Sequence, residues 1–536
     1  MSALAPTANP KSQIQNLKSQ TVARGLRLTH LWLLIPLAVA WFGASIDYIE
    51  PFDFWWNVKS GQIMMETGRF LGTDVLVWSP VREPYSNPQW GSQLLFYWLF
   101  DASPYLLLTM RALIISATMG LLLWLCFWRT GSLKVASIAT IVAYLTAWTN
   151  YGMRPQLFAF LPFVAFLFLL ERKDTHARWL PLLVPIMLFW VNVHGSFFLG
   201  VALMGIYAFG TFIERVGSQE GRGWLFSKAA AWQASWLGAA VVASLANPYF
   251  VGIYNYFFVA TNDPVARGLN VEWQAPTIYG GTGILFYSNV LILLASIYFG
   301  KRRMRPTEIL LILAFGYLSL TSLRNVMWWG WITAPILAQN LAAWGANWRE
   351  ARRRRSEAAE AAQAGRDGVE PSAHEEVVAG RRADLPALNV ALAVMIVGTA
   401  LLFTPLWRQA NPLVPAPAKP ALAASTPSKL AEFLKKGEVP APLFNYMEWG
   451  GYLEWELYPR YLMFLDGRFE ARKVEVWMDY LSVSGGRADW QSTLDRYGIK
   501  TLVLNKDFQK DLLPYVQESK TWHKVYEDKA AVVYTR

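Results

Sequence analysis

Apolar stretches that approach membrane-spanning length recur along this chain and restrict its possible folds more than any other feature. About 20 residues cross the hydrocarbon core of a bilayer, and several of these stretches must extend into their flanks to reach that length. About eleven are evident, at residues 28–46, 105–128, 135–148, 155–170, 180–193, 197–212, 229–245, 284–299, 309–320, 326–341 and 387–405. Backbone polar groups inside lipid must pair within the chain, so we expect a polytopic α-helical membrane protein.

The composition agrees with a membrane protein and argues against nucleic acid as a partner. Of the 536 residues 54% are hydrophobic and only 16% are charged, whereas soluble domains carry about a quarter charged residues. The net charge of +11 comes from cations in short loops between apolar stretches, as the positive-inside rule predicts. The single cysteine, Cys126, excludes a disulfide framework or a cysteine-based metal site within one chain.

The loop charges also predict the orientation of the chain. Residues 1–27 are basic and precede an apolar stretch without a cleavage pattern, so we interpret them as a cytoplasmic N-terminus leading into an uncleaved anchor. Every second loop is then basic, for example 129–134 and 301–305. An odd number of spans places the C-terminal segment outside.

Changes in composition divide the chain into six parts. After the N-terminus comes a membrane domain, residues 28–347, whose first outer loop is 47–103. Residues 348–384 are rich in Arg, Ala, Glu and Gly and predict a disordered or loosely helical cytoplasmic linker. The last span, 385–407, is followed by a proline-rich linker, 408–427, which we expect to be extended.

Residues 428–536 have the pattern of a soluble outer α/β domain. Helical patterns up to Lys436 and at 448–457, 474–482, 490–497 and 509–518 alternate with β-rich runs at 443–446, 461–465, 501–504 and 531–535. In the first outer loop, 57–66 and 92–102 are also predicted to be helical, the second as a helix lying in the outer membrane interface.

Three acidic residues open the first outer loop, and they are the first candidates for chemistry. Asp47, Glu50 and Asp53 precede the pair Trp55 and Trp56, and tryptophan prefers the level of the lipid headgroups. A carboxylate held there, partly out of water, is suited to act on a substrate with a polar head and a lipid tail. Asp53 is the strongest candidate, because the helix that follows it must pack back on the membrane.

Four further polar residues fall at outer ends of the predicted spans. Arg154 either anchors to headgroups or binds an anion, and His194 either builds a polar turn with Gly195 or faces a substrate. Glu272 lies on the same side. Arg324 lies in a very short turn, where an arginine needs a carboxylate or a substrate phosphate as partner. Arg111, deeper in the second span, is expected to pair with a structural acid.

In the outer domain the run FLDGR places Asp466 and Arg468 after a predicted strand. Polar residues at that position often face a ligand, although Asp466 and Gly467 also suit a tight turn. The sequence contains no Walker loop, G-x-S-x-G, HExxH or CxxC motif. The missing phosphate-binding loop argues against an ATP-driven pump.

Several motifs together resemble the GT-C superfamily of membrane glycosyltransferases, and more closely an uncharacterised bacterial group of GT-C-like proteins. They are FDFWWNVKSGQ to NPQW in the first outer loop, RPQLF at 154, WVNVHG at 190, ANPY at 246, EWQAP at 272, LRN at 323, and EWGGYL with FLDGR in the outer domain. The superfamily includes oligosaccharyltransferases, aminoarabinose transferases and protein O-mannosyltransferases, whose donors are sugars on polyprenyl phosphates or diphosphates.

The resemblance implies a hexosyl or pentosyl transferase at the outer face of the bacterial cytoplasmic membrane. Its expected partners are a lipid-linked sugar donor, membrane lipids and an acceptor glycan, lipid or protein. The family's loop carboxylate falls on Asp53, with Glu50 and Asp47 as alternatives, as general base. Because the loop carboxylate is a metal ligand in oligosaccharyltransferases, the resemblance also keeps a divalent metal as a candidate cofactor. It identifies no set of ligands for that metal.

Two departures from the family pattern keep other interpretations open. Asn57 stands where related sequences often have His, and Pro88 with Gln89 where they often have His-Glu. The alternatives are a non-catalytic GT-C-like protein of envelope assembly and a transporter of a lipid-linked substrate, which would need ionisable groups near the middle of the bilayer.

Overall fold

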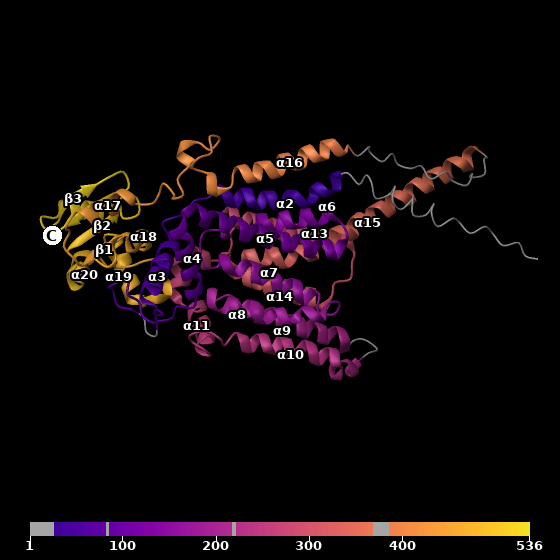
Figure 1. The fold of residues 1–536 in the computed structure, drawn as a ribbon, viewed down its shortest axis with the longest axis horizontal. Coiled ribbons are helices and arrows are strands. Elements are labelled where there is room, and N and C mark those ends of the chain that lie inside the picture. The colour runs from indigo at the N-terminus through magenta and orange to yellow at the C-terminus, as the bar shows by residue number, and fades with distance from the viewer. Residues whose placement is uncertain (1–25, 82–84, 217–220, 368–384) are drawn as a thin grey trace, which may run out of the picture.

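The chain folds into a long bundle of helices with a small α/β domain at one end (Figure 1). The structure is a computed structural model that describes residues 26–81, 85–216, 221–367 and 385–536. The α/β domain lies at the end of the bundle that carries α3 (Phe54–Thr67), α4 (Trp90–Ala102) and α11 (Gly252–Thr261). Helix α15 (Val326–Asp367) extends beyond the opposite end.

Each predicted span coincides with a helix. Four of these helices, α2, α5, α9 and α13, are long and apolar enough to cross a membrane, and several others are apolar but shorter. The number of spans therefore stays a prediction. The helices are α2 (Leu28–Ser45), α5 (Pro104–Thr130), α6 (Leu133–Thr146), α7 (Leu157–Glu171), α8 (Leu183–Val193), α9 (Phe197–Val216), α10 (Lys228–Ala243), α13 (Gly281–Gly300), α14 (Pro306–Thr321), α15 and α16 (Pro386–Leu402).

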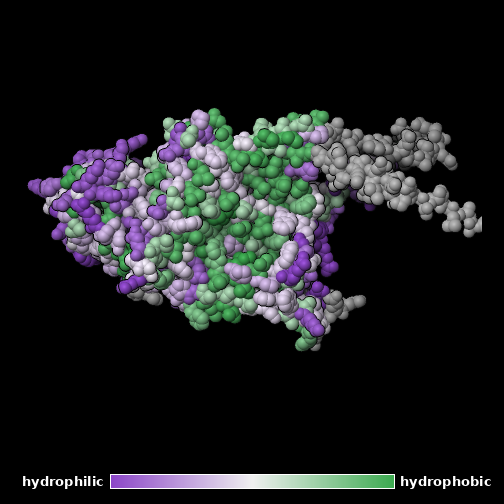
Figure 2. Space-filling view, viewed as in Figure 1, coloured by the Kyte–Doolittle hydropathy of each residue, from purple (hydrophilic) through white to green (hydrophobic). Residues whose placement is uncertain are grey.

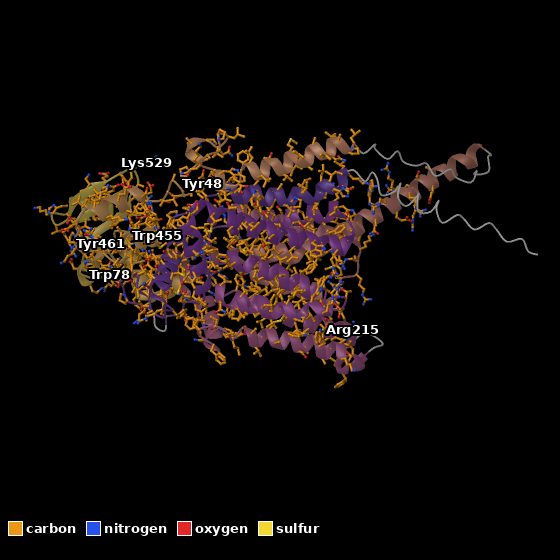
Figure 3. All side chains as sticks on the ribbon, in the orientation of Figure 1. Tyr48, Trp78, Arg215, Trp455, Tyr461 and Lys529 are labelled. Atoms are coloured by element: carbon orange, nitrogen blue, oxygen red, sulfur yellow. The ribbon has the colours of Figure 1, made fainter. Side chains whose placement is uncertain are left out.

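The surface of the bundle separates by polarity along its length. Hydrophobic residues cover its middle, and hydrophilic residues gather on the α/β domain and at the far end (Figure 2). Arg215, from one of the predicted inner loops, lies at the end away from Trp78 and Tyr461 (Figure 3). This separation is what a bilayer around the middle of the bundle requires.

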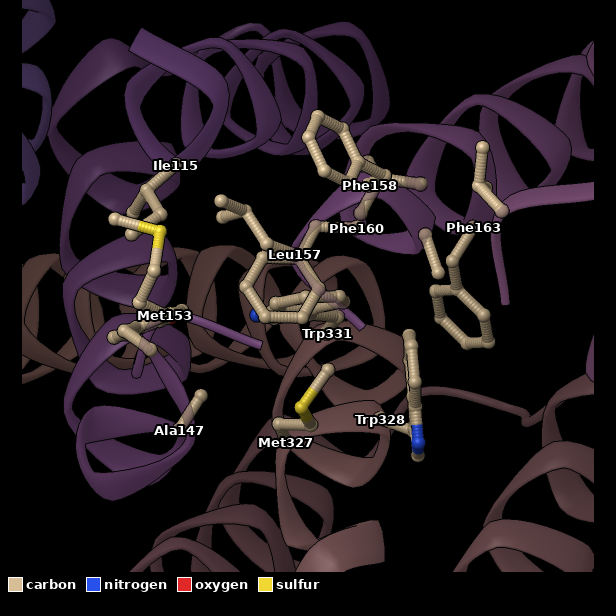
Figure 4. Close-up of a cluster of buried hydrophobic side chains, with 14 of the residues drawn as sticks. Ile115, Ala147, Met153, Leu157, Phe158, Phe160, Phe163, Met327, Trp328 and Trp331 are labelled. Carbon is tan, nitrogen blue, oxygen red and sulfur yellow. The ribbon is translucent and has the colours of Figure 1, made fainter. Parts of the chain in front are cut away.

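Aromatic side chains of α7 and α15 form the centre of the bundle core (Figure 4). The ring centroids of Phe163 and Trp328 are 4.6 Å apart, and those of Phe160 and Trp331 are 5.2 Å apart. All four side chains are buried. Such edge-on and tilted contacts hold the beginning of α7 against the beginning of α15, and the candidate site lies beside these two helix starts.

Of the two alternatives for 348–384, disordered or loosely helical, the helical one holds for the first part, because α15 continues as a helix to Asp367. The run is rich in alanine, and Glu350 pairs with Arg353 at 3.0 Å and with Arg354 at 2.8 Å. Ion pairs at these spacings support a helix that has no apolar face to pack. Residues 368–384 lie outside the described part of the chain.

The linker 408–427 is not simply extended. It contains a short 3-10 helix, Ala416–Ala418, and it is tied to the first outer loop. The amide of Ile49 donates to Ala421 O at 2.9 Å, and that of Ala423 donates to Ile49 O at 3.0 Å. Arg408 donates to the carbonyl of Asp47 at 3.0 Å. These bonds fix the start of the outer domain beside the end of α2.

The α/β domain forms as the sequence predicts, around a four-stranded sheet of order β1-β2-β4-β3. Strands β1 and β2 are parallel, and β4 pairs antiparallel with β2 and with β3. The elements are α17 (Ser428–Lys436), β1 (Leu443–Asn445), α18 (Met447–Leu457), α19 (Val474–Ser484), α20 (Trp490–Arg496), β2 (Thr501–Asn505), α21 (Leu513–Glu518), β3 (His523–Glu527) and β4 (Ala531–Thr535).

Two details of this domain differ from the prediction. Residues 461–465 are not a strand of the sheet, because their partner is the first outer loop: Trp78 N donates to Met463 O at 3.0 Å, and Met463 N donates to Leu76 O at 3.2 Å. Strand β3 was not predicted. It is an edge strand with mostly exposed side chains, so it carries little apolar signal.

The tryptophan pair of the first outer loop also lies elsewhere than predicted. Trp55 is 1% exposed and Trp56 6% exposed, so both contact protein rather than headgroups. The rings of Trp55 and Tyr452 are 4.9 Å apart, and Gly451 allows α18 to approach the backbone of Trp56. Helix α18 therefore supports α3 directly. Asp53 is the residue immediately before α3.

Replacing Gly450 with alanine tests how closely the other side of α18 packs against the loop that carries Asp466. A Cβ at residue 450 would overlap the carbonyl oxygen of Leu465, and overpacking of this kind costs about 1–3 kcal/mol. We expect a lower Tm for Gly450→Ala in detergent, and an unchanged Tm for the control Gly72→Ala, which has no atom within 4 Å. Equal Tm values for both variants would contradict this packing.

Candidate functional site

A cavity of about 240 Å³ opens where the α/β domain meets the helix bundle. Its walls come from the start of α3, the turn before α7, the α8–α9 turn, α11, the turns that follow α12 (Pro264–Leu269) and α14, and the loop after Asp466. Seven of the predicted site residues line it, although they are far apart in sequence: Asp53, Trp56, Arg154, His194, Glu272, Arg324 and Arg468.

Asp53 occupies the N-cap position of α3. Its carboxylate faces the guanidinium of Arg154, with 3.5 Å between Oδ2 and Nε. A Cβ on Gly467 would lie 2.6 Å from Asp53 Oδ1, so the outer-domain loop touches this carboxylate. About a third of the side chain is exposed, and it lines the cavity.

The surroundings of Asp53 favour its protonated form. Burial raises the pKa of the Asp53 carboxyl above its ordinary value, and the nearby carboxylates of Glu272 and Asp466 add to this effect, while Arg154 opposes it. A carboxylate with a raised pKa has a higher affinity for a proton, which is the property that a general base needs.

Arg154 lies between two carboxylates. It precedes α7 in the turn of residues 151–156 and forms an ion pair with Glu272 as well as facing Asp53. Burial favours the protonated form of Glu272, but the guanidinium groups of Arg154 and Arg324 outweigh it, so the pKa of Glu272 lies below its ordinary value. Glu272 is therefore ionised at neutral pH.

Hydrogen bonds between two turns place Glu272 and Arg324 side by side. Glu272 lies in a 3-10 turn, Val271–Trp273, and Arg324 lies in another, Leu323–Asn325. Ser322 Oγ donates to Glu272 O at 2.8 Å, and the amide of Leu323 donates to Gln274 O at 2.9 Å. These bonds hold both side chains at the same wall.

Among the residues that the structure describes, no carboxylate is in ion-pair contact with Arg324, in contrast to the other two arginines of the site, Arg154 and Arg468. Its guanidinium stacks on the ring of Trp273, 4.4 Å from the ring centre. Stacking on an indole orients a guanidinium while leaving its N–H groups available for hydrogen bonds. The sequence predicted a carboxylate or a phosphate as its partner, and this geometry favours an anion that enters the cavity.

His194 is held as a neutral imidazole of one tautomer. The amide of Ser196 donates to Nδ1 at 3.0 Å, and Ser196 Oγ lies 2.8 Å from the same atom. Because Nδ1 accepts, the proton of the ring is on Nε2. Burial and the charge of Arg324 lower the pKa of His194 to about 3, so it can donate a hydrogen bond at neutral pH but cannot act as an acid.

Asp466 and Arg468 belong to a buried ion cluster rather than to a free binding surface. The Nε of Arg468 donates to Asp466 at 2.7 Å, and Asp74 pairs with both Arg468 and Arg472. Arg468 lines the cavity, but its charge is compensated. The predicted turn at Asp466 is present, since its Oδ1 accepts from the amide of Arg468 at 2.9 Å.

Three further predicted residues lie outside the cavity wall, as Asp466 does. Asp47 pairs with Arg111 at 2.8 Å, which confirms the predicted acidic partner of that arginine. Glu50 accepts from Ser425 Oγ at 3.3 Å in the proline-rich linker. Trp55 packs on α18. These contacts connect α2, α5 and the linker, so Asp53 is the acid of the first loop that we retain for chemistry.

Sequence reasoning missed Trp273, Asn270, Tyr256 and Phe257 in the wall. Trp273 directly follows Glu272 in EWQAP, so its position next to a candidate acid was the available signal. Glu454 was also missed. Burial and the neighbouring Asp466 carboxylate raise the pKa of Glu454 well above its ordinary value, so the surroundings of this buried side chain favour its protonated form.

The described residues contain no group of three or more His, Cys, Asp or Glu side chains that could hold a metal ion. Asp53 and Glu272 are the two acids of the cavity wall, and Arg154 lies between them. The side-chain oxygen of Asn57, which also lines the cavity, accepts from Gln93 at 3.2 Å. These residues do not fit a divalent metal, which needs about six oxygen ligands.

Comparison with solved structures shows which fold this is. The structure superposes on that of the oligosaccharyltransferase AglB from Archaeoglobus fulgidus, in complex with an inhibitory peptide and a dolichol-phosphate. The match covers 94% of this chain and 74% of the AglB chain, with 13% sequence identity and a TM-score of 0.51. ArnT from Cupriavidus metallidurans in the apo state was also found, with 15% identity over 94% of this chain and 97% of that chain. Its TM-score is 0.48. No family model and no curated protein matches the sequence. The chain thus has the fold of this oligosaccharyltransferase, as the resemblance to the GT-C superfamily predicted.

The low pKa of His194 predicts how stability depends on pH. In the unfolded chain the imidazole has a pKa of about 6.5, so between pH 6.5 and pH 3 the unfolded state binds more protons and stability falls as the pH falls. By pH 5 the loss is up to about 2 kcal/mol. In His194→Asn, whose Oδ1 can still accept from Ser196 N, we expect Tm to fall less between pH 7.5 and pH 5. An equal fall would show that His194 is protonated in the folded state.

Proposed function

We propose that this chain is a membrane glycosyltransferase that moves a sugar from a polyprenyl phosphate or diphosphate to an acceptor at the outer face of the bacterial cytoplasmic membrane. The observation that carries the proposal is the convergence of Asp53, Arg154, Glu272 and Arg324 on one cavity in a protein with the GT-C fold. The matched AglB structure is a complex with a dolichol-phosphate, which is a lipid phosphate of the kind that such a cavity would accept.

The cavity has the polarity that a lipid-linked sugar needs. Its wall combines charged groups with the apolar side chains of Phe198, Leu199, Phe257 and Leu318. Next to Phe257 on α11, Phe258 is 62% exposed, so the apolar wall continues to the outside of the bundle. In the proposed complex the isoprenoid chain leaves along this wall, and its phosphate faces Arg324 and Arg154.

The proposed reaction is a direct displacement. Asp53 accepts the proton of an acceptor hydroxyl while the acceptor oxygen forms a bond to the anomeric carbon of the sugar. The bond between that carbon and the phosphate oxygen breaks, and its electron pair remains on the leaving lipid phosphate. Arg324 and Arg154 stabilise the charge that develops on the phosphate. The outer domain, which contacts Asp53 through Gly467, would recognise the acceptor or close the site.

Replacing Asp53 with asparagine tests the role of the base. Membranes that contain the protein would be incubated with a panel of radiolabelled undecaprenyl-phosphate sugars, and transfer to the acceptor fraction would be measured. A general base contributes roughly 10²–10⁴-fold to a rate, so Asp53→Asn should lose that factor. The control Glu66→Gln changes an exposed acid on the same helix and should keep full transfer.

Unchanged transfer in Asp53→Asn would remove Asp53 from the mechanism. If the wild-type protein binds the lipid donors and transfers no sugar from any of them, the result favours the non-catalytic assembly protein or the transporter of a lipid-linked substrate.

The charges around Asp53 predict the direction of a pH shift. A general base works above its pKa, so the rate should rise with pH through the pKa of Asp53. Glu272 raises this pKa, so Glu272→Gln should move the acidic limb of the rate profile to lower pH. A shift to higher pH, or none, would show that Asp53 and Glu272 are not coupled.

A further inference from the structure

The two carboxylates of the cavity already share a cation, and that cation is part of the protein. The guanidinium of Arg154 forms an ion pair with Glu272 and lies 3.5 Å from Asp53 Oδ2. A divalent metal between the same oxygens would have to displace this guanidinium. It would also lack ligands, because the neighbouring amide Asn57 donates to Asp53 O at 2.7 Å and accepts from Gln93.

The remaining charges leave one cation for a ligand. Arg468 is 4% exposed and is compensated by Asp466 and Asp74, and Arg154 is compensated by Asp53 and Glu272. Of the arginines that line the cavity in the described structure, Arg324 alone is without a carboxylate in ion-pair contact. A buried charge is tolerated when an opposite charge meets it. Arg324 is therefore the guanidinium of the described wall that can pair directly with one negative charge of a ligand.

We propose that the cavity binds a donor with a single negative charge, a phosphodiester in which one phosphate joins the sugar to the isoprenoid. It binds this donor without a divalent cation, because the guanidinium of Arg154 occupies the position between Asp53 and Glu272 that a metal ion would need. This proposal rests on the proposed function and narrows it. A diphosphate-linked donor would bring a second negative charge that no side chain of the described wall compensates. In this narrower proposal Arg324 is the residue that contacts the phosphate, and Arg154 positions Asp53 and acts on the phosphate through its charge alone.

The neutral tautomer of His194 fits the same ligand. Its Nδ1 accepts from Ser196, so its Nε2–H remains as a donor in a cavity that also holds Arg324. A neutral donor beside one guanidinium can hydrogen-bond a phosphodiester without adding a second positive charge.

Two probes that differ by one phosphate test the proposal without knowledge of the sugar. They are farnesyl methyl phosphate, a diester with one negative charge, and farnesyl methyl diphosphate, which has two. Binding of each to the full-length protein in detergent would be measured by calorimetry at neutral pH, once with excess EDTA and once with MnCl2. The phosphodiester should bind at least about tenfold more tightly than the diphosphate, and its Kd should be the same with EDTA and with Mn²⁺.

Variants identify the residue that meets the charge. Charge-assisted hydrogen bonds are worth roughly tenfold to a hundredfold in affinity, so Arg324→Ala should weaken binding of the phosphodiester by about that factor, and Arg324→Lys should recover part of it. The matched control is Arg267→Ala, an exposed arginine on α12 outside the cavity wall, which should leave Kd unchanged.

The outcomes separate this proposal from the function on which it rests. Tighter binding of the diphosphate, or binding of either probe that requires Mn²⁺, overturns the single-charge, metal-independent site and leaves the glycosyltransferase proposal standing. If neither probe binds with EDTA or with Mn²⁺, the cavity is not a lipid-phosphate site, and both proposals fall.

Discussion

The guanidinium of Arg154, held between the carboxylates of Asp53 and Glu272, joins three segments that are far apart in the sequence. The start of α3, the turn before α7 and the turn after α12 must all arrive at one point for these charges to be compensated. An arginine left there without partners would carry the full cost of a buried charge, which is large enough to favour another arrangement of the loops. The cavity exists because this charge cluster and the aromatic core beneath it position the same helix starts.

The outer domain completes the site rather than lying beside it. Gly467 touches Asp53, and Gly451 brings α18 against α3, so the carboxylate is held from the bundle side and from the domain side. The ion cluster of Asp74, Arg468 and Arg472 connects the first outer loop to the same domain. A domain fixed in this way can exclude water from Asp53, which strengthens the electrostatic effects on its pKa.

Local signals in the sequence predict much of this architecture, and long-range contacts account for what they miss. Apolar length alone located the helices of the bundle, and alternating patterns located most of the α/β domain. Asp53, Arg154, His194, Glu272 and Arg324 were found because polar residues are rare at the ends of apolar stretches. Their convergence on one wall, the pairing of 461–465 with residues 76–78 and the burial of Trp55 and Trp56 depend on partners hundreds of residues away. The helix that follows Asp53 and the family resemblance together favoured Asp53 over Asp47 and Glu50, and in the structure Asp47 pairs with Arg111 instead of lining the cavity.

The central claim is that these charges receive the phosphate of a lipid carrier from the bilayer. The most direct measurement is a cryo-electron microscopy map of the full-length protein in lipid nanodiscs with farnesyl methyl phosphate. The account predicts density for the phosphate within hydrogen-bond distance of the Arg324 guanidinium, with the isoprenoid chain lying along the contacting rings of Phe198 and Phe257 toward lipid. Phosphate density at another place on the protein, with Arg324 still stacked on Trp273 and facing only water, would contradict it.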